Sequence, residues 1–360
     1  MLAGALGGLE FVSPTHGWAV GQNTILATSD GGAHWTAQLS GNLNLTSVDF
    51  ISANDGWAVG ATTLLATTDG GAHWTALPEP CQPIRSVHFT SPTAGVAVAG
   101  GSGFGAAGLG PTAAVPLTGG TLLVTSDGGR TWHAPAASAN VPADVQSACF
   151  SGAQQGWLGA DGQLYRTADG GAHWAKLTSA ALPTGDANGA YPATMSVECA
   201  NGTAWAERVG PGAAMNQSPH IGYYANFHGG AVPLFAEQYF QNGAAPTTQA
   251  PGSEAGPFSA IDSATAAFVD WCPACGAGTA PWALVSNSGT AVGKMGNVGS
   301  ITQPLAASFQ SAQVGSVAGT YTVISNTAKD SVKSQQRIVG TTDGGRTWHV
   351  EWAGPWTTQG

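Results

Sequence analysis

Residues 28–35 read Thr-Ser-Asp-Gly-Gly-Ala-His-Trp, and the chain repeats this eight-residue stretch four more times. The further copies are TTDGGAHW at 67–74, TSDGGRTW at 125–132, TADGGAHW at 167–174 and TTDGGRTW at 341–348. Self-similarity of this kind indicates a repeat architecture and is weighed before any local propensity. A β-prone run such as Ile25-Leu26-Ala27 precedes each copy, so each copy predicts the turn of a β-hairpin, which we call a DGG turn.

The residues of the DGG turn suit a tight corner. An aspartate carboxylate can accept N–H groups from the residues that follow it, and glycine adopts positive φ angles without steric cost. The closing tryptophan opens the next strand, and its ring can cover the turn. We therefore interpret the repeated positions as structural, and they are Asp30, Gly32, Trp35, Asp69, Gly71, Trp74, Asp127, Gly129, Trp132, Asp169, Gly171, Trp174, Asp343, Gly345 and Trp348.

These repeated aspartates and histidines do not indicate one catalytic or metal site. Copies on successive repeats lie around a ring, so their side chains cannot converge on a single substrate or ion. His34, His73 and His173 are expected to be repeat positions and not ligands. No metal site and no cofactor are expected from this pattern.

A second signature precedes the first four DGG turns. It reads FVSPTHGWAVG at 11–21, FISANDGWAVG at 50–60, FTSPTAGVAV at 89–98 and FSGAQQGWLG at 150–159. Two strands joined by a tight turn, followed by the DGG hairpin, make a four-stranded antiparallel meander, which is the blade of a β-propeller. Degenerate copies at 224–230 and 285–290 fill the interval before residue 341, and the total is seven. An eight-bladed ring would need a further copy, which is not found.

The fold class predicted is therefore all-β, a seven-bladed β-propeller that forms one domain over residues 1–360. The blades are expected at about residues 9–40, 45–78, 84–136, 145–180, 194–235, 257–296 and 305–353. Blade one begins with its own first strand and blade seven ends with its own fourth. We therefore expect the ring to close by side-chain packing and not by a blade shared between the termini.

Composition limits the class of partner. The chain has 10 Lys+Arg against 20 Asp+Glu, a net charge of −10 and 43% hydrophobic residues. A nucleic acid or an anionic membrane needs a basic face, so neither is expected as a partner. No run of 18 apolar residues is present, so no transmembrane segment is expected. The low content of charged residues, 8%, favours a secreted or cell-surface protein.

The five cysteines suggest disulfides more than metal or redox chemistry. Cys272 and Cys275 form a single CxxC without a second pair, so a disulfide that clasps a loop is the better interpretation in an oxidising compartment. Cys149 and Cys199 lie on the same type of strand in adjacent repeats, so they are expected to bridge two blades. This pairing leaves Cys81 alone.

Insertions give the main indication of function. In a propeller the second-to-third and fourth-to-first connections leave the side opposite the DGG turns, and binding often uses long loops on a rigid scaffold. Long connections are expected at 100–120, 207–221, 272–281 and 321–336, with linkers at 135–144, 178–192 and 231–257. Tolerated Gly/Ala/Pro padding is the alternative interpretation. The candidate binding residues on this face are Arg85, Phe104, Glu207, Arg208, Tyr223, Asp270, Trp271, Trp282 and Arg337.

The paired signatures resemble those of the Ycf48 family of seven-bladed propellers, and the DGG turns resemble the Asp-box, or BNR repeat. That family includes photosystem II assembly factors and bacterial relatives, and the resemblance covers blades one to four and seven. It implies a basic patch that holds a photosystem subunit. Here the four arginines outside the DGG turns are spread over four blades, so the resemblance carries over only the fold and the idea of a binding face.

Asp-boxes also occur in sialidases and in certain glucanases. Glycoside hydrolysis asks for two carboxylates that face each other across a cleft, and no spacing in this chain pairs two of them. The sequence therefore favours a non-catalytic, secreted or cell-surface binding or assembly module whose partner is a protein or a glycan. A carbohydrate-active hydrolase is the first alternative, and a homotypic subunit of an extracellular assembly is the second.

Overall fold

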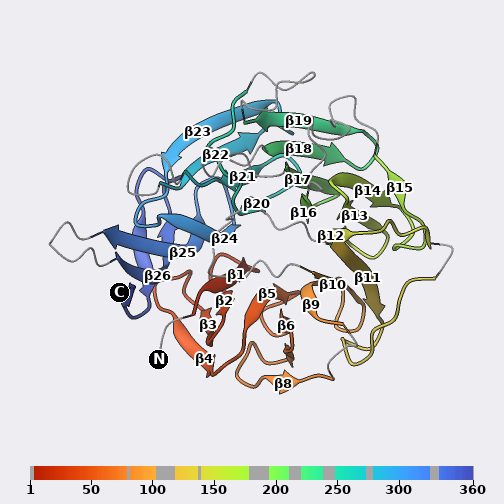
Figure 1. The fold of residues 1–360 in the computed structure, drawn as a ribbon, viewed down its shortest axis with the longest axis horizontal. Coiled ribbons are helices and arrows are strands. Elements are labelled where there is room, and N and C mark those ends of the chain that lie inside the picture. Colours follow the sequence, from red (N-terminus) through yellow and green to blue (C-terminus); the bar gives the residue numbers. More distant parts are fainter. Residues whose placement is uncertain are drawn as a thin grey trace.

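The computed structural model describes residues 4–78, 82–102, 118–136, 139–177, 194–210, 220–237, 248–272, 279–324 and 332–359. These residues form β-strands and no α-helix. The strands fall into seven antiparallel sheets around a central axis (Figure 1), which confirms the predicted seven-bladed propeller. Within the same ranges, no helix with the length and hydropathy of a membrane span is found.

The first four blades follow each other along the chain from the N-terminus. Blade one consists of β1 (Leu6–Phe11), β2 (Gly17–Gly21), β3 (Thr24–Thr28) and β4 (Thr36–Ser40). Blade two consists of β5 (Leu45–Phe50), β6 (Gly56–Gly60), β7 (Leu64–Thr67) and β8 (Thr75–Ala76). Blade three consists of β9 (Ile84–Phe89), β10 (Gly95–Ser102) and β11 (Thr118–Thr125). Blade four consists of β12 (Val145–Ser151), β13 (Gln155–Ala160), β14 (Gln163–Thr167) and β15 (Ala175–Lys176).

The last three blades complete the ring. Blade five consists of β16 (Thr194–Ala200), β17 (Thr203–Val209), β18 (His220–Asn226) and β19 (Ala231–Ala236). Blade six consists of β20 (Phe258–Ala260), β21 (Ala266–Val269), β22 (Pro281–Ser286) and β23 (Ala291–Asn297). Blade seven consists of β24 (Gln303–Phe309), β25 (Gly315–Ile324), β26 (Val332–Thr341), β27 (His349–Ala353) and β28 (Thr357–Gln359).

Two blades depart from the four-stranded pattern in their outer strand. In blade three the fourth position is reduced to a single bridge between Val124 and His133. In blade seven the fourth position is split in two, because β27 pairs with the residues around Ile338 and β28 pairs with the start of β26. The first strand of each blade lies nearest the axis (Figure 1).

The Phe and Gly-Trp positions of the second signature have a simple steric explanation. In five blades the glycine that opens the second strand faces the phenylalanine that ends the first. A Cβ atom at Gly17 would lie 2.6 Å from the Phe11 ring, and at Gly56 it would lie 2.4 Å from Phe50. The same contact recurs at Gly95, Gly156 and Gly315. The glycine is therefore required so that an aromatic ring can lie flat against the second strand.

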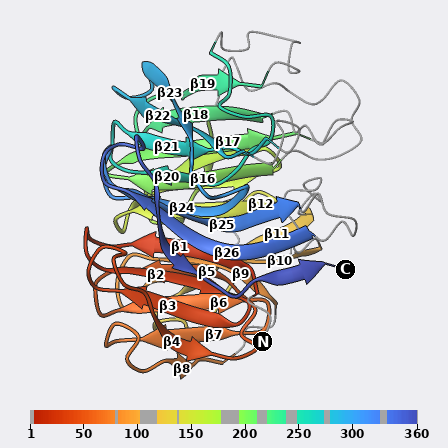
Figure 2. The same ribbon diagram turned by 90° about the vertical axis from the view of Figure 1, so that its left-hand side faces the viewer.

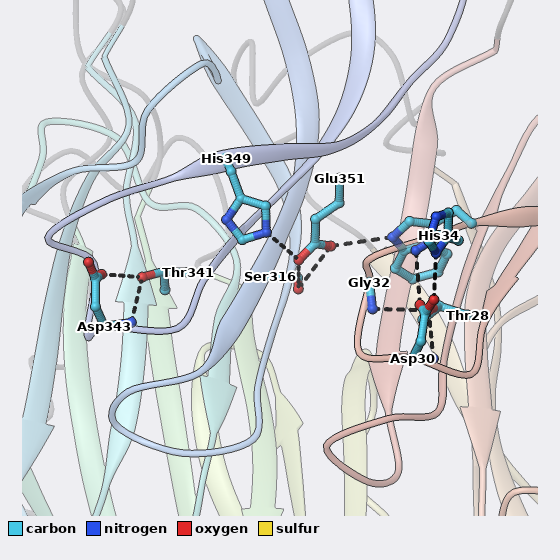
Figure 3. Close-up of polar contacts among 10 residues, drawn as sticks. Thr28, Asp30, Gly32, His34, Ser316, Thr341, Asp343, His349 and Glu351 are labelled. Carbon is cyan, nitrogen blue, oxygen red and sulfur yellow. Dashed lines mark hydrogen bonds and ion pairs between the residues drawn. The ribbon is translucent and has the colours of Figure 1, made fainter.

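The DGG turns share one hydrogen-bond pattern. In the first, the buried Thr28 hydroxyl donates to Asp30 Oδ1 at 2.9 Å and accepts the Gly32 N–H at 3.0 Å, while Asp30 Oδ1 accepts the His34 N–H (Figure 3). Gly31 and Gly32 have φ angles of 72° and 90°, a region that favours glycine. The same contacts recur in the other four copies. Each aspartate therefore caps its own turn.

The tryptophan of each DGG turn packs edge-on against the phenylalanine of the first strand. The ring centroids are 5.7 Å apart for Phe11 and Trp35 and 5.9 Å apart for Phe50 and Trp74. Blades three, four and seven have equivalent pairs at up to 6.4 Å. Such edge-to-face pairs stabilise a core beyond the area that they bury.

Adjacent blades are joined by the tryptophan of the second strand. Trp57 stacks on Phe89 of blade three with 3.5 Å between the ring centroids, and its Nε1–H donates to the Gly128 carbonyl of the next DGG turn at 3.0 Å. Trp18 makes the equivalent contacts with blade two. The hydrophobic core therefore lies between blades.

Blades one and seven meet without sharing a strand. Leu6, Leu9 and Leu26 pack with Ala318 and Ile338 in one buried cluster across this junction. Figure 1 shows these two blades side by side, and Figure 2 shows the ring edge-on with both chain ends toward the same side. The ring closes through side chains, as the sequence predicts.

We call the side where second and fourth strands end the long-loop face, and the opposite side the DGG-turn face. Strands extend further toward the long-loop face than predicted. Residues 207–209 belong to β17 and residues 220–221 to β18, so both ends of the expected insertion 207–221 are strand. Residues 321–324 and 332–336 are likewise strand, and 231–236 form β19 instead of linker. These strands are longer than predicted because their backbone pairing with the neighbouring strand continues through polar residues.

Candidate functional site

A ring of side-chain links surrounds the central channel. In each blade a residue near the end of the first strand contacts the first strand of the next blade. In blades one to four and seven this residue directly precedes the repeated phenylalanine, whereas in blades five and six it precedes Cys199 and Ala260. These residues differ in type and are Glu10, Asp49, His88, Cys149, Glu198, Ser259 and Ser308. Together they connect all seven blade junctions, including the junction between blades seven and one.

Three of these links are carboxylates that accept a backbone N–H. Glu10 accepts from Phe50 at 2.8 Å, Asp49 accepts from Phe89 at 2.7 Å, and Glu198 accepts from Ala260 at 2.9 Å. Burial raises the pKa of Glu198 to about 7, against the opposing effects of the Ala260 N–H and of His88. Burial, with the charge of Asp49, also raises the pKa of Glu10 well above its ordinary value.

Two links are of a different chemical kind. His88 Nε2 lies 2.9 Å from the Phe150 carbonyl oxygen, and its Nδ1 lies 3.5 Å from Asp49 Oδ1. Burial acts to lower the pKa of His88, but the Asp49 carboxylate, the Phe150 carbonyl and the charge of Glu198 together outweigh this effect, and the net change is upward. Cys149 and Cys199 form a disulfide with a Cα–Cα distance of 5.7 Å, the pairing that the sequence analysis proposes.

The junction between blades seven and one has a further link on the outer strand. The Glu351 side chain is 3% exposed and accepts hydrogen bonds from the Ser316 hydroxyl at 3.2 Å and the Trp35 Nε1–H at 3.3 Å (Figure 3). Gln38 occupies the same place between blades one and two, where it accepts from Trp74 and donates to Gly70. Burial raises the pKa of Glu351 to about 7, although the Trp35 and Ser316 hydrogen bonds act to lower it.

The channel contains a cavity of about 320 Å³ with little charge. First-strand residues of six blades line it, among them Gly8, Ser47, Ser147 and Ala306, and Glu198 is the one ionisable residue among the described lining residues. The Glu198 carboxylate already accepts a hydrogen bond from blade six. The described wall of this cavity therefore has no pair of free carboxylates for glycoside hydrolysis.

A second cavity, of about 470 Å³, opens on the long-loop face between blades five and six. Residues 249–253 form one wall, and Glu237, Cys272, Thr279, Pro281 and Asn297 complete it. Its volume is within the range of ligand pockets. We call it the loop-face pocket.

Three buried ionisable residues lie beside the loop-face pocket. Glu207, His220 and Asp270 are 2%, 0% and 1% exposed, and each offers a ligand atom within 4.8 Å of those of the other two. His220 Nε2 lies 3.1 Å from Asp270 Oδ2, which also accepts the N–H of Gly252 in the pocket wall at 2.7 Å. Burial raises the pKa of Glu207 to about 8, despite the opposing effect of His220.

The predicted binding-face residues lie in several places. Glu207, Arg208, Tyr223, Asp270 and Trp282 are at most 3% exposed, so the structure does not offer them as a binding surface. The reason is that they lie within or directly beside strands whose neighbours cover them. Trp282 packs against Phe309 and Trp348 of blade seven, with no more than 5.9 Å between ring centroids.

The remaining candidates also do not form one site. Trp271 is half-buried and bridges to Glu254, and Arg85 lies on the first strand of blade three with both terminal guanidinium nitrogens buried and without a hydrogen-bond partner. Arg337 stacks 3.8 Å over the Tyr321 ring and lies near Trp356, which is 47% exposed. Phe104, Cys275 and Cys81 lie outside the described residues. Cys272 is disulfide-bonded.

His220 and the links of the ring other than Cys149–Cys199 were not predicted from the sequence. His220 is outside the repeats, and nothing in its spacing pairs it with Glu207 or Asp270. The ring residues share a position but not a chemical type, so they are not visible as a motif. The available signal is the position itself, one residue before the repeated phenylalanine in five of the seven blades.

Comparisons with known proteins support the repeat assignment. Residues 3–104 match the family described as photosynthesis system II assembly factor YCF48. No curated protein matches the sequence. A solved structure described as YCF48 bound to D1 peptide is 16% identical, with 88% of this chain and 90% of that chain covered and a TM-score of 0.53.

Glycoside hydrolase structures share the fold at lower identity. A GH74 enzyme from Niastella koreensis is 11% identical, with 96% of this chain and 66% of that chain covered and a TM-score of 0.56. An ancestral GH74 enzyme is 13% identical, with coverage of 96% and 54% and a TM-score of 0.55. At this level of identity only the fold is shared. The family match over residues 3–104, the YCF48 likeness of the fold and the seven blades together bear out the predicted resemblance to Ycf48-like BNR-repeat propellers.

Proposed function

We propose that the chain is a non-catalytic binding or assembly module that works outside the cytoplasm and holds a segment of a protein partner on its long-loop face. One observation carries the non-catalytic part. The channel carboxylates Glu10, Asp49 and Glu198 each accept a backbone N–H from the next blade. They hold the ring together, and so they are not available as the opposed acid and nucleophile that glycoside hydrolysis needs.

The loop-face pocket is the place that we propose for the partner. It lies on the side opposite the DGG turns, and its volume of about 470 Å³ suits one or two side chains of an extended segment. The YCF48 structure with a D1 peptide supports a peptide-binding role for a propeller of this type. We extend that role to this chain as a proposal, with a different and unidentified partner segment allowed.

Location outside the cytoplasm is supported by the cysteines. Cys149 and Cys199 are joined in a disulfide, and Cys272 is disulfide-bonded as well. Disulfides persist in oxidising compartments and are rare where thiols are kept reduced. The low content of charged residues agrees with this location.

Site-specific photo-crosslinking in the source cells tests the proposal. A photoreactive amino acid is placed at Asn297, an exposed residue of the loop-face pocket, or at Arg130, an exposed residue of a DGG turn. We expect one defined partner polypeptide to be captured from position 297 and not from position 130, and mass spectrometry identifies the captured segment.

Three outcomes would contradict the proposal. Equal capture from both positions would remove the role of the long-loop face. Capture of a second copy of the chain alone would favour a homotypic assembly. Release of reducing sugar from a β-glucan by the purified protein, lost in a Glu198→Gln variant, would favour the hydrolase.

A further inference from the structure

We propose that Glu207, His220 and Asp270 bind one divalent transition-metal ion, with zinc preferred, and that this ion ties blade five to blade six. The inference goes beyond the binding role proposed above. It uses residues that neither the repeats nor the ring of links involves.

The fold brings the three residues together from two blades. Glu207 lies in β17 and His220 in β18, where Val209 pairs with His220 and Glu207 pairs with Gly222. Residues two apart on a strand share a face, so the two side chains are diagonal neighbours on the same face of blade five. Asp270 follows β21 in blade six, where its N–H is held by the Pro281 carbonyl.

The distances suit ligands that share one ion. All three ligand atoms lie within 4.8 Å of one another, and His220 Nε2 and Asp270 Oδ2 are 3.1 Å apart. Zinc bonds to imidazole nitrogen and carboxylate oxygen are about 2.0–2.2 Å long, so neighbouring ligand atoms lie about 3 Å apart or somewhat more. Small side-chain movements would bring Glu207 into the same shell.

Unpaired oxygens supply an independent observation. Glu207 Oε1 and Asp270 Oδ1 are both buried, and neither has a hydrogen-bond partner. A buried carboxylate oxygen without a partner is costly, and buried polar groups in folded proteins are otherwise almost always satisfied. A cation between the two carboxylates would satisfy both oxygens at once.

The donor set selects the class of ion. One imidazole with two carboxylates suits zinc and its first-row neighbours. Calcium prefers six to eight oxygen ligands, and a histidine among three donors disfavours it. Because all three residues are at most 2% exposed, the ion would be buried between the two blades.

Zinc titration of the EDTA-treated full-length chain tests the site, and His173→Gln provides a matched control. His173 also pairs with an aspartate, Asp169, at 2.7 Å, but its side chain is 67% exposed. We expect one tight Zn²⁺ per chain in the wild type and in His173→Gln. Glu207→Gln and His220→Gln should bind Zn²⁺ at least about 100-fold more weakly, because even the loss of an outer-shell partner costs about 10- to 100-fold.

Cobalt substitution keeps the test decisive if a variant fails to fold. Co²⁺ added to the wild-type chain should produce visible absorption bands of a nitrogen/oxygen site, and one equivalent of Zn²⁺ should remove them. The proposal is overturned if the wild type binds no Zn²⁺ and shows no such bands. It is also overturned if folded Glu207→Gln and His220→Gln, checked by circular dichroism, bind Zn²⁺ like the wild type.

Discussion

Replacement of Glu351 by glutamine should make the protein more stable at alkaline pH. Burial raises the pKa of this carboxyl to about 7, whereas the unfolded chain keeps a value near 4.5. Below pH 4.5 the group is protonated in both states and has no effect on the free energy of unfolding. Between pH 4.5 and 7 the unfolded state loses its proton first, so stability falls, and above pH 7 the loss is complete.

The size of the effect follows from the difference between the two pKa values. One pKa unit corresponds to about 1.4 kcal/mol, so a rise from 4.5 to about 7 is worth about 3 kcal/mol at pH 8.5. Glutamine carries no charge and keeps an oxygen that can accept from Ser316 and Trp35. The chain already uses glutamine at the equivalent place, where Gln38 links blades one and two. Glu351→Gln should therefore exceed the wild type by up to about 3 kcal/mol at pH 8.5 and match it near pH 4.

Urea unfolding at pH 4, 6 and 8.5, followed by tryptophan fluorescence, measures the difference. Gln38→Glu is the reciprocal variant and should lose stability at pH 8.5 while it stays close to the wild type at pH 4. Glu351→Ala should be less stable than the wild type at pH 4, because two donors lose their acceptor. A Glu351→Gln variant that is less stable than the wild type at pH 8.5 would refute the account of this junction.

Three further predictions concern other parts of the ring. Trp57→Val introduces the residue that blade three has at this position and should lower the free energy of unfolding by about 3–5 kcal/mol. Trp356→Val, at an exposed site, should change it little, and urea unfolding compares the two variants. The double variant Cys149→Ser, Cys199→Ser should lose about 2–4 kcal/mol, and reduction should lower its melting temperature less than it lowers that of the wild type, because only the disulfide of Cys272 remains to be reduced. Asp127 has its pKa lowered to about 2 by hydrogen bonds within its turn, so it stabilises the fold above pH 3.8 and loses this effect as the pH falls through 2; Asp127→Asn should be less stable at pH 7, with a smaller further loss on acidification.

The sequence predicts the blades well because their signals are local. Thr28, Asp30 and Gly32 contact one another within five residues, and Gly17 is fixed by the ring of Phe11 six residues earlier. Because these contacts are short-range, the same residue pattern recurs in the sequence wherever the same turn forms. The degenerate turns of blades five and six are found for the same reason, since the strand–turn–strand spacing persists after the aspartate is lost.

The candidate site is less predictable because its contacts are long-range. Glu207 appears in the sequence as the start of a polar insertion, but pairing with Gly222 keeps it in a strand and Asp270 of the next blade lies within ligand distance. Gly252, which holds Asp270, belongs to a linker without periodicity. The continuation of the strand through Glu207 has no recognisable pattern in a single sequence. The same is true of the linker that brings Gly252 to Asp270.

The ring of links was hidden for a different reason. The side chains at this position need only reach the next first strand, and glutamate, histidine, cysteine and serine all do so. A requirement that the side chain contact the next strand therefore does not fix the type of residue at this position. Only Cys149 and Cys199 can be paired from sequence, because they lie on the same type of strand in adjacent repeats.

Native-state hydrogen exchange at the Phe11 amide tests most directly whether side-chain links close the ring. This N–H donates to Ser308 Oγ at 3.1 Å across the junction between blades seven and one, as the Phe50 and Phe89 amides donate across the next two junctions. We predict that Phe11 is protected to the same degree as Phe50 and Phe89, and that Ser308→Ala lowers the protection at Phe11 alone. If the Phe11 amide exchanged at the rate of an exposed loop while Phe50 and Phe89 stayed protected, the junction between blades seven and one would not be closed, and the account would be contradicted.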